Sequence, residues 1–358
     1  MACAAGVRAA GLLAGVAVDA VLGDPRRGHP VAVFGRAAAA LERRIYADSK
    51  VAGVVYTGAC VTGAAALGLV ADRLAARHGA PARTVLMAAA TWAVIGGTSL
   101  GREGTLMARL LEDTGGATGR DTGEDARLDA ARRRLSHLCA RDPQGLDAKD
   151  LARATVESIA ENTSDAAVAP LLWGAIGGVP ALLAYRAVNT LDAMVGYRDT
   201  RYRDFGWASA RLDDVANWVP ARMTGLLTVA CAPVVCADRA KDDSQPSPGA
   251  ERLRSARDAV RRSYESLRRD GGAHPSPNAG RCEAAFAGAL GVRLGGTNTY
   301  GGEVERRPEL GRGEPPEAVD IHRAVRLSTA VTVAAAALTA TVSVMAVKGQ
   351  RRLRPQGR

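Results

Sequence analysis

Aromatic residues and paired cysteines are scarce in this chain. Only 4% of its 358 residues are Phe, Trp or Tyr, and its six cysteines show neither C-x-x-C nor Cys/His ligand spacing. We therefore expect neither a structural zinc site nor a disulfide framework. The chain also lacks any G-x-x-x-x-G-K-[ST] string. This absence excludes a P-loop as the means of binding a nucleotide.

A nucleic-acid-binding signature is also missing, although the formal net charge is +10. No helix-turn-helix, zinc-finger or aromatic RNA-binding motif accompanies the charge. Basic loops at an anionic membrane surface account for the same excess of Lys and Arg. We expect membrane lipid, and not nucleic acid, as a partner.

Long apolar segments alternate with segments rich in Arg, Asp and Glu, which the mean hydropathy of -0.04 hides. A membrane-spanning helix needs about 20 mostly apolar residues. Four firm and up to six possible segments qualify, and the first is interpreted as a retained membrane helix rather than a signal peptide. The candidates are residues 7–22, 51–70, 84–100, 166–188, 218–237 and 325–347.

These segments predict an all-α fold, a polytopic integral membrane helical bundle with soluble helical loops. We expect one domain over residues 1–358, with soluble insertions at 101–150 and 238–272 and a basic tail at 348–358. A loop is expected from Gly101, followed by a soluble helix, and a charged soluble helix is expected over 251–270. The glycine-rich run near 291–302 is interpreted as a loop.

The segment 166–188 is expected to be broken or re-entrant. It is apolar, but Pro170, Gly174, Gly177, Gly178 and Pro180 interrupt it. Irregular backbone at membrane depth is tolerated only where protein or a water-filled cavity surrounds it. The polar residues at both ends of this segment are therefore candidates for a site.

Carboxylates precede the segment at helical spacing. In a helix, Glu157, Glu161 and Asp165 fall at i, i+4 and i+8 and share one face. With Asn162 they offer the oxygen ligands that Mg²⁺ prefers. An exposed acidic helix face is the alternative.

Arginines, aspartates and aromatics crowd together after the segment. Guanidinium groups bind phosphate and carboxylate oxygens bidentately, so acids and arginines together suggest phosphoryl chemistry. The aromatics Tyr197, Tyr202, Phe205 and Trp207 favour a site over a solvated connector. His29 and His274, each in a His-Pro dipeptide, are candidate proton shuttles or turn histidines.

Five ordered motifs resemble the CobD/CbiB family of cobalamin biosynthesis, the adenosylcobinamide-phosphate synthases. They read GDPRRGHPV, ESIAENTSDAAVAP, YRAVNTLDAMVGYR, RYRDFGWASARLDDVANWVPAR and HPSPNAGRCEAAFAGALGVRLGG. Residues 101–150, 241–270 and the tail match only loosely. Arg281-Cys282 departs from the pattern, where an aromatic residue and a proline are expected.

The resemblance implies a multi-pass enzyme of the cell membrane. It would join adenosylcobyric acid to (R)-1-amino-2-propanol or its O-phosphate by an amide bond, with ATP and Mg²⁺, to give adenosylcobinamide or its phosphate. An acyl phosphate is the expected intermediate. Other late cobalamin-pathway membrane enzymes are possible partners.

Motif by motif, the resemblance and the chemistry suggest residue roles. Expected catalytic residues are Glu157, Asp165, Asp192, Asp213, Asp214, His29 (with Asp24) and His274, and Glu157 and Asp165 are the expected magnesium ligands. Expected substrate- or phosphate-binding residues are Arg198, Arg201, Arg203, Arg211, Asn162, Asn189, Asn217, Ser276 and Asn278. A transporter or a non-catalytic scaffold for corrin intermediates is the alternative, and a soluble helical ligase is a third possibility.

Overall fold

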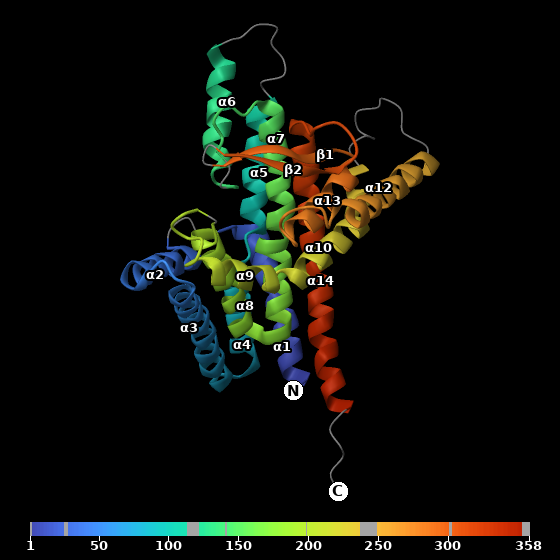
Figure 1. Cartoon of the computed structure of the whole chain (residues 1–358). Coiled ribbons are helices and arrows are strands. Elements are labelled where there is room, and N and C mark those ends of the chain that lie inside the picture. The colour runs from blue at the N-terminus through green and yellow to red at the C-terminus, as the bar shows by residue number, and fades with distance from the viewer. Residues whose placement is uncertain are drawn as a thin grey trace. The chain divides into compact units, whose positions relative to one another are not determined.

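The computed structural model describes residues 2–24, 28–112, 122–139, 142–197, 199–236, 249–300 and 303–352. These residues form two compact units (Figure 1). Unit 1 comprises residues 1–98, 165–220 and 334–358, and unit 2 comprises residues 99–164 and 221–333. Arg198 lies outside the described residues, and so do residues 238–248 of the expected insertion at 238–272.

Helices dominate both units. In chain order the helices are α1 (Ala2–Leu22), α2 (Pro30–Ile45), α3 (Lys50–Arg77), α4 (Gly79–Val94), α5 (Gly97–Glu112), α6 (Thr122–Leu135), α7 (Ala148–Thr163), the π-helix η1 (Ser164–Val168), α8 (Ala169–Val195), α9 (Trp207–Ala216), α10 (Trp218–Cys231), the 3-10 helix η2 (Ala232–Cys236), α12 (Gly249–Asp270), α13 (Ala279–Leu290) and α14 (Ala318–Arg352). Two strands, β1 (Arg293–Tyr300) and β2 (Glu303–Gly311), form an antiparallel hairpin.

Five helical stretches within the described residues are long and apolar enough to cross a membrane. They are Lys50–Arg77, Gly79–Glu112, Ala148–Val195, Trp218–Cys236 and Ala318–Met345. The prediction of an all-α polytopic membrane protein is confirmed. Helix α1 is not among these five stretches of the described residues, and the interpretation of residues 7–22 as a retained membrane helix stays a prediction.

Two local predictions were wrong. Residues 101–112 are helical, because α5 continues to Glu112, where we expected a loop from Gly101. The glycine-rich run after α13 forms strand β1, not a loop, and its register with β2 shifts between Leu294 and Gly296. Gly295 and Gly296 have positive φ, which lets the strand bulge there.

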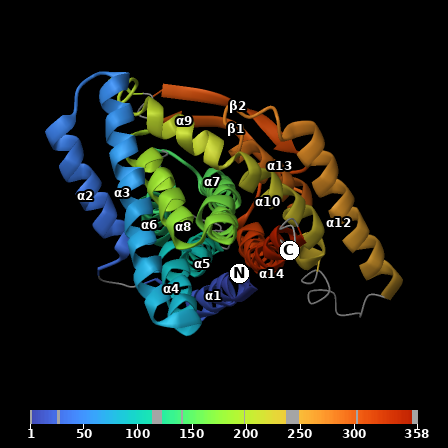
Figure 2. The same ribbon diagram turned by 90° about the horizontal axis from the view of Figure 1, so that it is seen from below.

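In unit 1, small residues let α1 approach α4 closely (Figure 2). A Cβ added at Gly15 would lie 2.4 Å from the Cβ of Thr91. Asp19, which is buried, accepts hydrogen bonds from the Thr98 backbone N–H (3.0 Å) and hydroxyl (2.8 Å). Asp19 therefore caps the start of α5.

Helix α8 reverses direction, as expected for a broken segment. Gly178 has φ 68° and ψ −156°, a conformation essentially restricted to glycine, and Pro180 follows it. The Tyr185 hydroxyl lies 3.2 Å from the carbonyl oxygen of Asp165, 20 residues earlier. A straight helix would separate those residues by about 30 Å. The segment therefore turns back on itself.

The aromatics that suggested a site are largely structural. Phe205 is fully buried and packs against Tyr46 and Tyr56, with ring centroids 5.1 Å and 5.0 Å apart. Arg201 lies over the Tyr46 ring at 4.4 Å. This cluster ties the loop before α9 to α2 and α3.

In unit 2, α12 packs along α13, and α13 also contacts α7 and the hairpin. Glycines permit the closest approach: a Cβ at Gly288 would lie 2.4 Å from the Arg262 carbonyl oxygen. Asp147 caps α7, since its carboxylate accepts from the Asp150 N–H at 2.8 Å.

Candidate functional site

A chain of polar side chains runs through unit 1 where the returning half of α8 meets α9. The Tyr185 hydroxyl donates to Asn217 Oδ1 at 2.8 Å, and Asn217 Nδ2 donates to Asp213 Oδ2 at 3.0 Å. Tyr185 and Asn217 are both buried. Two of the expected site residues, Asp213 and Asn217, are therefore brought together.

Arg186 joins a second group of charges in the same unit. Its Nη1 donates to Asn189 Oδ1 at 3.1 Å, and the Asp165 and Asp24 carboxylates interact with it electrostatically. Its Nε is buried and has no hydrogen-bond partner among the described residues. A buried unpaired donor is costly unless something binds it, which makes Arg186 a candidate for holding an anionic oxygen.

Asp213 connects the two groups, because Asn189 and Asn217 both interact with its carboxyl group. Burial raises the pKa of Asp213 from 3.8 to about 6, and the negative charge of Asp214 adds to the effect. The two amide side chains act in the opposite direction by stabilising the carboxylate. Such a carboxyl group is ionised at neutral pH and is a stronger base than an ordinary aspartate.

His29 lies at the edge of this cluster through Asp24. Its Nδ1 accepts from the Val31 N–H at 3.2 Å and caps α2, and its Nε2 lies 4.0 Å from Asp24 Oδ1. Asp24 in turn interacts with Arg186. His29 is therefore a turn histidine that also lies beside a carboxylate, and its expected role as a proton shuttle stays a prediction.

The expected arginines that the structure describes in unit 1 show no common partner. Arg201 donates to Glu42 Oε1 at 3.0 Å, and Tyr202 donates to the same oxygen at 3.0 Å. Arg211 lies 3.6 Å from Asp214, and Arg203 is exposed. Asp192 lies near the end of α8, where its backbone accepts from the Gly196 N–H. The structure therefore assigns Arg201 to a structural contact with α2.

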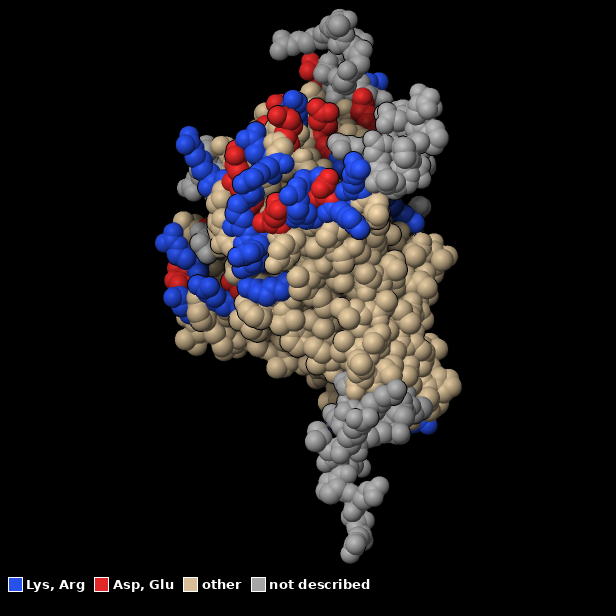
Figure 3. Space-filling model, turned by 90° about the vertical axis from the view of Figure 1, so that its right-hand side faces the viewer, with Lys and Arg blue, Asp and Glu red and all other residues tan. Residues whose placement is uncertain are grey.

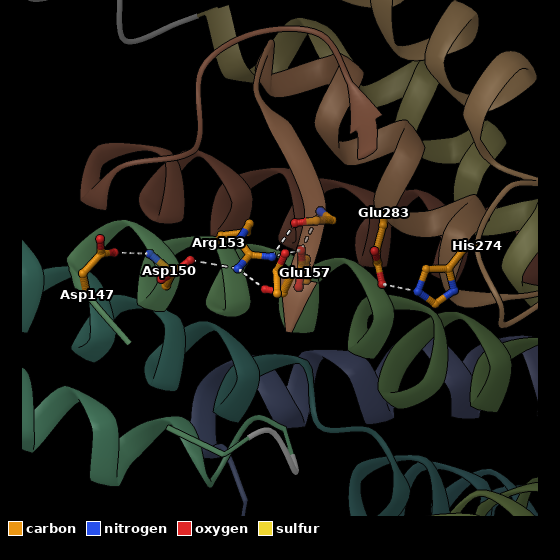
Figure 4. A network of polar contacts seen from close by, with 8 residues as sticks. Asp147, Asp150, Arg153, Glu157, His274 and Glu283 are labelled. Atoms are coloured by element: carbon orange, nitrogen blue, oxygen red, sulfur yellow. Dashed lines mark hydrogen bonds and ion pairs between the residues drawn. The ribbon is translucent and has the colours of Figure 1, made fainter. Parts of the chain in front are cut away.

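In unit 2, Glu157 fastens α7 to the hairpin (Figure 4). Its Oε1 accepts from the Gly295 N–H at 2.8 Å and lies 3.8 Å from Arg153 Nη1. Arg153 also donates to the carbonyl oxygens of Gly295 and Thr297 and to Asp150. Both members of the pair are buried. Together they satisfy backbone groups at the bulge of β1.

The expected magnesium ligands do not fit this arrangement. Glu157 is buried against Arg153, whereas Glu161, one turn later, is exposed. Asp165 lies in the π-helix η1, which breaks the i+4 spacing, and it belongs to unit 1. Asn162 donates to the Ser158 carbonyl oxygen at 2.9 Å. Among the described residues no three His, Cys, Asp or Glu side chains gather as a metal site.

His274 pairs with Glu283, a residue that the sequence did not single out. His274 Nε2 lies 3.9 Å from Glu283 Oε1, and both side chains are 3% exposed (Figure 4). Nδ1 of His274 accepts from the Ser276 N–H at 3.0 Å, and the Ser276 hydroxyl accepts from the N–H groups of Asn278 and Ala279. His274, Ser276 and Asn278 thus shape the turn that begins α13.

Tyr185 and Arg186 are the main residues that sequence reasoning missed, although both stand in a motif that it quoted. The signal for Arg186 was available, because an ionisable residue inside an apolar segment is a functional candidate by default. Arg153 had a similar signal, lying four residues before Glu157. Glu283 had none, since only the fold brings it to His274.

Comparisons with known proteins agree with these motifs. Residues 12–328 match the family described as CobD/Cbib protein. "Cobalamin biosynthesis protein CobD" of Mycobacterium tuberculosis is 51% identical over 92% of this chain and 94% of its own length. The proteins of the same name from Pelobacter propionicus and Geobacter metallireducens are 37% and 41% identical, over 92% and 84% of this chain and 93% and 85% of their own lengths. No solved structure matches.

Proposed function

Because the chain belongs to the CobD/CbiB family, we propose that it is a cell-membrane enzyme that joins adenosylcobyric acid to (R)-1-amino-2-propanol or its O-phosphate. The names of its relatives support a role in cobalamin biosynthesis, and the five candidate spans support a membrane protein. The product is adenosylcobinamide or its phosphate. ATP is the proposed co-substrate, because a carboxylate and an amine do not condense unaided in water.

The observation that carries the proposal is the partly buried Asp213 carboxyl group, which accepts from Asn217 Nδ2 at 3.0 Å and whose pKa is raised to about 6 by burial. An alkylamine reaches the site as an ammonium ion, since such groups have a pKa of about 10. It must lose a proton before its lone pair can attack a carbonyl carbon. Asp213, ionised at neutral pH and oriented by Asn189 and Asn217, is suited to accept that proton.

Arg186 is the proposed partner of the acid. Its unpaired buried Nε can donate to an oxygen of the substrate carboxyl group, and the negative charge that develops there during attack strengthens this bond. Asn189 accepts from Arg186 and also interacts with Asp213. The Asn189 side chain therefore sets the spacing between Asp213, which accepts the proton, and Arg186, which donates a hydrogen bond to the substrate oxygen.

In the amide-forming step the C–N bond forms as the bond between the carbonyl carbon and its activated oxygen breaks. The ammonium group first gives one proton to Asp213, and the second proton that the nitrogen loses leaves with the departing oxygen and its activating group. The expected magnesium pair does not take part in this account, since Glu157 is engaged by Gly295 and Arg153. Residues of unit 1 alone carry the proton transfer.

The test is a mass-spectrometric assay of the purified protein in detergent. Adenosylcobyric acid, aminopropanol or its phosphate, and MgATP are supplied together, and each is then omitted in turn. We expect product only from the complete mixture. Asp213→Asn should lower turnover by roughly 100-fold or more, the usual contribution of a general base. Asp204→Asn, an exposed aspartate paired with Lys50, is the matched control and should retain activity.

No product from the complete mixture would refute the ligase. If Asp213→Asn forms product at the wild-type rate, the proposed role of Asp213 is refuted, but the proposed ligase reaction still stands.

Transport is the second candidate, because the reversal at Gly178 resembles the discontinuous helices of transporters. A transporter would move a corrinoid only across sealed vesicles. The proposed enzyme instead makes its product in detergent, where no gradient exists.

A further inference from the structure

Helix α12 has one face packed on the protein and another that no described helix covers fully. On the packed face, Ala259 and Ser263 are buried, and the Ser263 hydroxyl donates to the Ala285 carbonyl oxygen at 2.9 Å. The other face carries an apolar stripe at helical spacing, formed by Leu253, Ala256, Val260 and Tyr264. Leu253 is 54% exposed and Tyr264 is 50% exposed. Such a stripe favours contact with an apolar partner.

The stripe forms one wall of a groove of about 530 Å³. Val229 and Pro233 form the opposite wall and come from α10 and η2, which together are a candidate membrane span. Both walls belong to unit 2. A hydrophobic groove beside a membrane-spanning helix is open to the acyl chains of the bilayer.

Two arginines, Arg257 and Arg261, line the same groove. Arg257 makes no hydrogen bond or ion pair within the described part of the chain, and Arg261 reaches Glu265 only at 4.0 Å, with both side chains largely exposed. Figure 3 shows Lys and Arg, with Asp and Glu among them, on one face next to a wide surface of uncharged residues. That pattern is typical of a protein surface at the level of lipid headgroups.

We propose that this groove binds an anionic phospholipid. Its acyl chain lies between the α12 stripe and Pro233, and its headgroup phosphate is held by Arg257 and Arg261. Helix α12 is then an interfacial helix rather than the soluble helix that its charge predicted. The proposal is independent of the ligase reaction, because no residue of the groove belongs to the polar cluster of unit 1.

The lipid and a free phosphate share the same headgroup chemistry, and the lining distinguishes them. Leu253 and Val260 offer a free phosphate nothing, but with the ring of Tyr264 they shield an acyl chain from water. A zwitterionic lipid would use the same apolar wall without the net charge that the arginines favour.

Native mass spectrometry of the full-length protein tests the charge requirement. Mixed micelles contain phosphatidylglycerol and phosphatidylcholine in equal amounts, and bound lipids are counted after gentle removal of detergent. We expect phosphatidylglycerol to be retained preferentially. Arg257→Gln should weaken that retention roughly fivefold, and the double variant with Arg261→Gln should weaken it about 25-fold. The double variant Arg254→Gln, Arg268→Gln is the control, because both residues are exposed on α12 outside the groove.

A reporter at position 264 tests the acyl chain. Phosphatidylglycerol brominated in its acyl chains should quench the tryptophan fluorescence of the Tyr264→Trp variant. The wild-type protein, which has four tryptophans, is the reference, and the variant should show more quenching than it does. Glycerol phosphate in solution should not displace the lipid. Equal retention of both lipids, no effect of the groove arginines, no added quenching, or displacement by glycerol phosphate would each overturn the proposal.

Discussion

Removal of the Glu157 carboxylate tests whether this residue binds a metal or holds unit 2 together. In the structure Glu157 accepts the Gly295 N–H and offsets the charge of Arg153. Glu157→Ala therefore leaves a buried N–H without its acceptor, at a cost of about 1–3 kcal/mol. It also removes one of two carboxylates beside Arg153, since Asp150 remains at 2.8 Å.

A buried charge left without any partner costs roughly 3–5 kcal/mol. Because Arg153 keeps Asp150 as a partner, the destabilisation by Glu157→Ala should be smaller than the sum of that cost and the cost of the lost hydrogen bond. We expect a loss of about 3 kcal/mol. For a unit of this size that corresponds to a fall in Tm of roughly 6–12 °C. Glu157→Gln retains an oxygen acceptor for Gly295 and should lose about half as much.

Thermal unfolding in detergent, followed by fluorescence-detected size exclusion, measures the shift. Glu161→Ala is the control, since Glu161 lies one turn later on α7 and is exposed. A metal ligand behaves differently: turnover disappears while Tm without added metal stays unchanged. Glu157→Gln with wild-type Tm and no amide formation would refute the structural role and restore the metal interpretation.

Three further outcomes are expected from unit 1. Gly178→Ala should destabilise the protein by about 1–3 kcal/mol, because φ of 68° is strained for alanine and the new Cβ would lie 3.3 Å from Arg8 Nε; thermal unfolding measures it. Turnover should rise with pH through about 6 as Asp213 ionises, and this ionisation should vanish in Asp213→Asn. The folded protein binds the Asp213 proton more tightly than the unfolded chain does, so the free energy of unfolding should fall as pH rises from about 4 to 6. Arg186→Gln should lower turnover and keep a Tm similar to that of the wild type, since a purely structural role would instead lower the Tm.

The membrane fold was predictable because its signal is local. Long apolar segments, the capping Asp147 and the Gly/Pro-interrupted segment 166–188 each show themselves within a few residues. The β-hairpin was not predictable in the same way. Its glycines resemble a turn, and their backbone groups are satisfied by residues distant in sequence, namely the partner strand, Arg153 and Glu157.

The candidate site was predictable in part. Asp213, Asn189, Asn217 and Asp165 were named from motifs, and the structure places them in one unit around Arg186. The helical spacing of Glu157, Glu161 and Asp165 misled, because it assumed one regular helix and η1 changes the turn at Ser164. The aromatics misled for another reason: a scarce residue type can serve a core, as Phe205 does.

The reversal at Gly178 explains why catalytic residues should stand at both ends of an apolar segment. Asp165 precedes the segment and Tyr185 follows its midpoint, yet the two are in hydrogen-bonding contact. If the segment crossed the membrane as one straight helix, about 30 Å would separate Asp165 from Arg186, and no substrate carboxyl group could meet both. The turn places Arg186 among Asp24, Asp165 and Asn189, and Asn189 connects it to Asp213. The placement of the proton acceptor and of the hydrogen-bond donor in the proposed reaction thus depends on the backbone conformation of a single glycine, so a change at Gly178 should reduce turnover as well as stability.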